Sequence, residues 1–164
     1  MSRQAVVDPT ETTSPWGFHS ELCLQKKSGG RWILLSDLVY EAKDTAVYIA
    51  HAGDETDLAS IPRGLWNVFP PIGDYDWAAV IHDSLYTNQS VTRERADSIL
   101  LEAMEATKVG WWARRTIYLS VRVGGRGIWK RHAQAKAEAE RIAALTAGPV
   151  PKELTPWDDA DVIE

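Results

Sequence analysis

The hydrophobic pattern of this chain changes character between residues 50 and 74. Before that boundary, short runs rich in aromatic, aliphatic and β-branched residues, such as 32–38 and 45–50, alternate with turn residues such as those at 28–30, which predicts strands. After the boundary, apolar residues recur at helical spacing. Prolines at 70 and 71 and Gly73 exclude a long helix between the two parts. We therefore expect an α+β fold, with a small N-terminal antiparallel sheet packed on three to four helices.

The helical part divides at its breaker residues. The first helix is expected from 74 or 75 to about 86, and the second from about 93 to 107 with Thr92 as its N-cap. A third helix is expected over 111–123, interrupted by the glycines at 124 and 125, and a fourth over 129–145.

The length of 164 residues suggests one globular domain, which we place at residues 16–147. Residues 1–15 are polar and predict an N-terminal arm, and residues 148–164 form an acidic tail that contains Trp157. Such a tail either docks on a partner or on its own domain, or remains a disordered acidic end, and the sequence leaves both interpretations open.

Composition excludes several classes of protein. The chain has 18 Lys and Arg against 23 Asp and Glu, a net charge of −5, which argues against a dedicated binder of duplex nucleic acid. Its single cysteine, Cys23, excludes an intrachain disulfide and a Cys-rich zinc module. No window is apolar enough for a transmembrane segment. The first residues lack the apolar core of a signal peptide, so we expect none.

The candidate chemistry lies in the first two predicted helices. His82 shares a helical stripe with Tyr86, and Asp97 borders the apolar face of the next helix. Because a short turn joins the two helices, they should pack antiparallel, with His82 and Asp97 at similar depth. A carboxylate that holds an imidazole fixes its tautomer and raises its basicity, as a general base requires. Asp83 points a quarter-turn away, where it is a candidate ligand for a cation such as calcium.

A structural interpretation stands beside the catalytic one, because a His–Asp bond between helices can simply hold them together. Asp57 and Ser60 have two interpretations as well. They are suited to capping local backbone amides, and they are also candidates to line a cleft with His82.

Residues from about 18 to 130 resemble an uncharacterised family of tailed phages, prophages and bacteria, the domain of unknown function 1353. The shared motifs are ThrAsp-x-AlaSer-x-Pro, HisAsp-x-x-Tyr and AlaAsp, represented here by Thr56, Asp57, Ala59, Ser60, Pro62, His82, Asp83, Tyr86, Ala96 and Asp97. The resemblance implies a phage or prophage origin, and with it residence in the host cytoplasm or the virion. It brings no established activity.

Residues 70–105 also resemble, more distantly, the phospholipase A2 core. That resemblance makes His82 the base that activates water, Asp83 a calcium ligand, and Asp97 the acid that orients His82, with Tyr86 hydrogen-bonded to Asp97. It implies a lipid substrate. The Gly-rich calcium loop of that family is replaced here by residues 69–73, which contain one glycine and two prolines.

Two functions of different classes follow. The first is a phage hydrolase, phospholipase-like, that uses His82, Asp97 and Tyr86. The second is a non-enzymatic virion or assembly component that docks on other phage subunits through its arm and tail.

Overall fold

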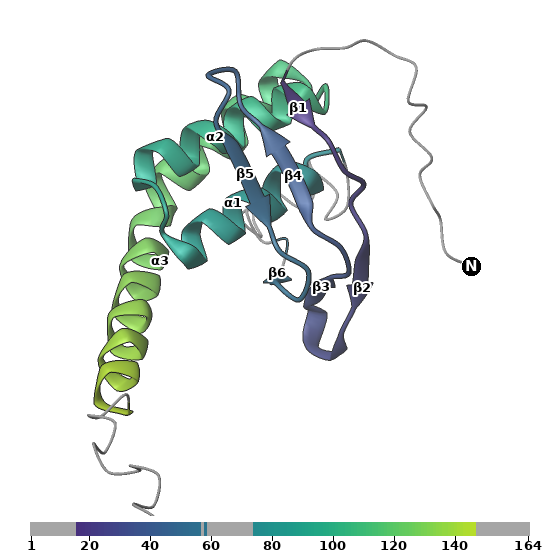
Figure 1. The fold of residues 1–164 in the computed structure, drawn as a ribbon. Coiled ribbons are helices and arrows are strands. Elements are labelled where there is room, and N and C mark those ends of the chain that lie inside the picture. The colour runs from purple at the N-terminus through teal and green to yellow at the C-terminus, as the bar shows by residue number, and fades with distance from the viewer. Residues whose placement is uncertain (1–15, 57, 59–73, 147–164) are drawn as a thin grey trace, which may run out of the picture.

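The fold is α+β, as predicted, and is seen in a computed structural model that describes residues 16–56, 58 and 74–146 (Figure 1). Within these residues, two three-stranded antiparallel sheets precede three helices. The N-terminal arm, the acidic tail, Asp57 and Ser60 lie outside the described residues.

The first sheet has the order β1-β4-β5 and packs on the helices. Its strands are β1 (Gly17–Phe18), β4 (Leu38–Glu41) and β5 (Val47–Ala50). Leu38, Tyr40 and Ala50 are fully buried, which places alternate residues of the central strand in the core. The Tyr40 hydroxyl donates a hydrogen bond of 3.0 Å to Glu102 of α2 (Arg93–Ala106), so a polar contact accompanies the apolar packing.

The second sheet has the order β2-β3-β6. It comprises β2 (Leu24–Lys26), β3 (Trp32–Leu34) and β6 (Glu55–Thr56), with the 3₁₀ turn η1 (Ser28–Gly30) joining β2 to β3. Strand β6 lies in a stretch that carries no strand signal in the sequence. It forms because Glu55 and Thr56 pair with β3.

The prediction of one strand over 32–38 was wrong, because this segment divides between the two sheets. Leu34 ends β3 and Leu38 begins β4, and both are buried, whereas Leu35 between them is exposed. The carboxylate of Asp37 accepts a hydrogen bond of 2.8 Å from the Ala52 amide, so this residue serves a turn rather than a strand.

Helices α1 (Asp76–Asn88) and α2 lie close to their predicted positions. Gln89 ends α1 in the left-handed conformation, with φ at 50°. The Thr92 side chain accepts a hydrogen bond of 3.2 Å from the Arg95 amide, which confirms the predicted N-cap of α2.

The predicted interruption at the glycines 124 and 125 was wrong. A single helix, α3, runs from Trp111 to Thr146, and the described part of the chain therefore has three helices. Gly125 is buried because the Tyr86 hydroxyl of α1 occupies the space beside it; a Cβ there would lie 2.5 Å from that oxygen. The glycine thus permits close packing of two helices instead of breaking one.

The core lies between the first sheet, α1, α2 and the N-terminal half of α3, and includes Ile81, Ile99, Leu100, Met104 and Ile117. The C-terminal half of α3 extends away from this body (Figure 1). Among the described helices, none has the length and apolar character needed to cross a membrane.

Candidate active site between α1 and α2

His82 and Asp97 meet across the α1–α2 interface, as their positions in the sequence predict. Their Nε2 and Oδ1 atoms are 3.2 Å apart, although His82 precedes the inter-helix turn and Asp97 follows it. His82 is 4% exposed and Asp97 is fully buried. A buried carboxylate is costly unless it is well satisfied, so its other contacts decide what the pair can do.

Three further side chains donate hydrogen bonds to Asp97. The Tyr86 hydroxyl donates to Oδ1 at 2.6 Å, and Arg122 of α3 and Arg93 donate to Oδ2 at 2.9 and 3.4 Å. Burial alone would raise the pKa of Asp97, but hydrogen bonds from His82, Tyr86 and Arg122 outweigh burial and hold its pKa below the ordinary value. Asp97 is therefore a carboxylate at neutral pH.

The contacts of Arg93 and Arg122 with Asp97 were not predicted from the sequence. Arg93 stands four residues before Asp97, which is the ion-pair spacing of a helix, so this contact could have been predicted. Arg122 comes from a different helix, 25 residues further along the chain, and no local pattern indicates that it reaches Asp97.

The hydrogen bond to Asp97 determines which ring nitrogen of His82 carries the proton. Because Asp97 is ionised, Nε2 carries the proton and donates it to Asp97, which leaves the lone pair on Nδ1. Nδ1 is buried and has no hydrogen-bond partner among the described residues. The nearest carboxylate oxygen in the described ion pairs, Oδ1 of Asp83, is 4.0 Å from it. An imidazole held at one nitrogen and unpartnered at the other has the form of a general base.

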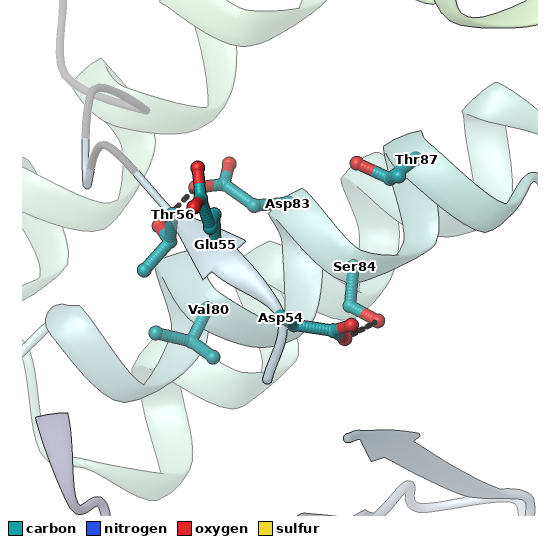
Figure 2. Close-up of a pocket in the computed structure, with 7 residues that line it drawn as sticks. All are labelled: Asp54, Glu55, Thr56, Val80, Asp83, Ser84 and Thr87. Carbon is teal, nitrogen blue, oxygen red and sulfur yellow. Dashed lines mark hydrogen bonds between the residues drawn. The ribbon is translucent and has the colours of Figure 1, made fainter. Parts of the chain in front are cut away.

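Asp83 lies on the rim of a small hollow between α1 and β6 (Figure 2). The Thr56 hydroxyl donates to Oδ2 of Asp83 at 2.5 Å and accepts from the Leu58 amide at 3.1 Å. The hollow has a volume of about 50 Å³, enough for ordered water but far below that of a site for a whole small-molecule ligand. It is lined by Asp54, Glu55, Thr56, Val80, Asp83, Ser84 and Thr87.

The described residues place no cluster of metal-ligating side chains around Asp83. No three His, Cys, Asp or Glu side chains in the described ranges converge closely enough to hold a metal ion. The other two carboxylates of the hollow are engaged elsewhere: Asp54 accepts from Ser84 and from the His51 amide, and Glu55 pairs with Lys27 and Arg31. Among described groups, the expected calcium ligand is thus Asp83 alone.

One comparison with known proteins gives a match. A family model described as "Protein of unknown function (DUF1353)" matches residues 32–121, more than half of the chain. The matched stretch contains His82, Tyr86 and Asp97. No curated protein and no solved structure matches the chain.

Proposed function

The chain belongs to the DUF1353 family of proteins of unknown function, and we propose that this member is a hydrolase in which His82 acts as the general base. One observation carries the proposal. Asp97 holds Nε2 of His82 at 3.2 Å, while the buried Nδ1 has no partner among the described residues. A purely structural histidine is expected to have both ring nitrogens satisfied, because an unpaired buried nitrogen costs free energy.

The proposed reaction is attack of water on an ester carbonyl. Nδ1 of His82 takes a proton from water, and the water oxygen bonds to the carbonyl carbon. Asp97 stabilises the imidazolium that forms, and Tyr86 and Arg122 position Asp97. When the tetrahedral intermediate collapses, the carbon–oxygen bond to the alcohol breaks and Nδ1 returns its proton to the departing oxygen.

The hollow at Asp83 is the proposed source of that water. Asp83 lines the hollow and also lies beside Nδ1, and the volume of about 50 Å³ fits water. The ester itself must bind outside the hollow, and because His82 is 4% exposed, we propose that the ester reaches Nδ1 in an open form of the protein. Cycles of opening of this kind set the rate in many enzymes.

The proposed substrate is a phospholipid ester, and the proposed setting is a phage or prophage protein in the host cytoplasm or the virion. The substrate is proposed because the motif His82-Asp83-x-x-Tyr86, with Asp97 on the next helix, is similar to the phospholipase A2 core. The setting is proposed from the resemblance to the family of tailed phages, prophages and bacteria. Because no three His, Cys, Asp or Glu side chains of the described residues converge to hold a metal ion, no step of the reaction above is assigned to calcium. The assay with calcium and with chelator measures whether calcium contributes to the rate.

The test measures fatty acid released from phosphatidylglycerol vesicles by the full chain, with calcium and with chelator. His82→Gln removes the base but keeps an amide that can bond to Asp97, and we expect it to lower the rate by about 10²- to 10⁴-fold. His51→Gln is the matched control, because His51 is exposed and pairs with Asp37. Equal rates for folded wild-type and His82→Gln protein would overturn the proposal.

A second candidate function is a non-enzymatic virion or assembly component. The observation that favours it is the burial of the central carboxylate, since Asp97 joins α1, α2 and α3 through four hydrogen-bonded partners and is fully covered. Mass spectrometry of purified phage particles tests this candidate. Presence of the chain at stoichiometric amounts, together with no ester hydrolysis, would favour it over the enzyme.

A further inference from the structure

The positive charge of this acidic chain is concentrated on α3. Residues 111–137 contain seven Lys and Arg and no Asp or Glu, in a protein whose net charge is −5. Arg115, Arg126, Lys130 and Arg131 are exposed, and none of them forms an ion pair with the residues that the structure describes. The cations are therefore available to an external anionic surface.

Large apolar side chains lie among these cations on the outer face of α3. Trp112, Leu119 and Val123 are 78%, 59% and 84% exposed, and their spacing of seven and four residues puts them on one stripe of the helix. At 100° per residue, Arg115 and Arg126 border this stripe and Lys130 continues it.

The opposite face of the same helix is already used by the fold. Ile117, Val121 and Gly125 are its buried residues, and they pack toward α1 and α2. Two arginines of α3 are paired internally, Arg114 on the buried side with Glu105 at 3.5 Å and Arg122 at the flank with Asp97 at 2.9 Å. Internal packing thus accounts for one face of α3. Apart from the ring contact of Trp112 with its neighbour Trp111, the Trp112 stripe has no described aromatic contact.

We propose that the outer face of α3 binds the surface of an anionic phospholipid bilayer. A helix with Trp, Leu and Val on one stripe and arginines beside it lies in the membrane interface, with its apolar side chains among the acyl chains and its cations at the headgroups. Charge complementarity selects an anionic membrane. The exposed apolar stripe favours a membrane over a nucleic acid, because phosphate contacts do not require Leu119 and Val123 to be exposed.

This surface goes beyond the proposed hydrolase and does not depend on it. Asp97 connects the two regions, because Arg122 at the flank of α3 donates a hydrogen bond to it. A membrane-bound α3 would hold the His82 site close to ester substrates. The binding test is separate from the activity test, since His82→Gln should bind vesicles as well as the wild type does.

The experiment is sedimentation of the full chain with vesicles of phosphatidylglycerol and phosphatidylcholine mixed, and with phosphatidylcholine alone. We expect binding to the anionic vesicles that weakens as salt is raised. Arg115→Gln/Arg126→Gln/Lys130→Gln should lower the partition coefficient by on the order of 100-fold, because each cation near an anionic surface contributes roughly fivefold. Leu119→Ser should lower it by roughly tenfold.

Matched controls separate this surface from general charge and general hydrophobicity. Lys26→Gln/Lys27→Gln/Arg31→Gln removes the same charge from the β2–β3 hairpin, which lies away from α3 (Figure 1). Leu35→Ser removes a leucine that is 57% exposed, close to the 59% of Leu119. Both control proteins should bind like the wild type.

Three results with vesicles would overturn the proposal. They are equal binding to anionic and neutral vesicles, no binding to either, and loss of binding in the hairpin control as large as in the α3 variant. A single-stranded oligonucleotide serves as the alternative polyanion. If it binds the protein more tightly than the vesicles do, and Leu119→Ser leaves both affinities unchanged, the surface recognises nucleic acid instead of lipid.

Discussion

Asp97 is a buried carboxylate on which polar side chains of all three described helices converge. Its two oxygens accept hydrogen bonds from His82, Tyr86, Arg93 and Arg122, and no part of it is exposed to water. Replacing one partner of a buried ion pair leaves the other charges without compensation, which costs more than the pair itself contributes. The carboxylate is therefore more important to stability than its position at the edge of an apolar face indicates.

We expect Asp97→Ala to lower the free energy of unfolding by about 3–5 kcal/mol, measured by urea denaturation at pH 7. Asp44→Ala is the control, because Asp44 also pairs with an arginine, Arg95, but is exposed, and it should change the midpoint little. Similar losses in the two variants would show that burial of Asp97 does not govern its contribution.

At the scale of elements, the helices could be predicted more closely than the strands. Thr92 marks the start of α2 because its side chain must cap a free amide, and this local requirement is visible in the sequence. Strand β6 and the split of 32–38 depend on which distant strand each residue pairs with, so no local pattern contains them. The contact between His82 and Asp97 could be predicted from helical geometry, whereas the contact of Arg122 with Asp97 depends on how α3 packs against α2.

The two glycines of α3 give a sharper test of element packing. Gly125→Ala should destabilise the protein, because the new Cβ meets the Tyr86 hydroxyl at 2.5 Å. Gly124→Ala meets nothing within 4 Å and should stabilise the protein by about 0.5–1 kcal/mol through helix propensity. Thermal denaturation compares the two variants.

The same prediction extends to a double-mutant cycle. In the Tyr86→Phe background the obstructing oxygen is absent, so Gly125→Ala should cost less than it does in the wild type. Additive effects would mean that Tyr86 is not what excludes a side chain at position 125.

At the scale of the whole molecule, the buried negative charge and the exposed positive charges lie in different places and have different roles. The carboxylate of Asp97 fixes the junction of three helices from inside, while the cations of α3 that lack ion pairs with the described residues face outward. The inner group responds to pH, because protonation of Asp97 removes its charge. The outer groups act through attraction to charges outside the protein, which salt screens.

Acid should therefore weaken the fold partly through Asp97. Its pKa is lowered in the folded protein, despite burial, by bonds from His82, Tyr86 and Arg122, so the stabilisation it provides is complete above its unfolded pKa of about 3.9 and is lost as the pH falls through the lower folded value. Asp97→Asn has no charge to lose there. We expect the difference in unfolding free energy between wild type and Asp97→Asn to be largest near pH 7 and to become smaller below about pH 4.

Other carboxylates titrate in both proteins, so the difference in unfolding free energy isolates Asp97. Urea denaturation from pH 7 to pH 3 measures it, and a constant difference over that range would contradict the assignment of Asp97 as a carboxylate at the helix junction.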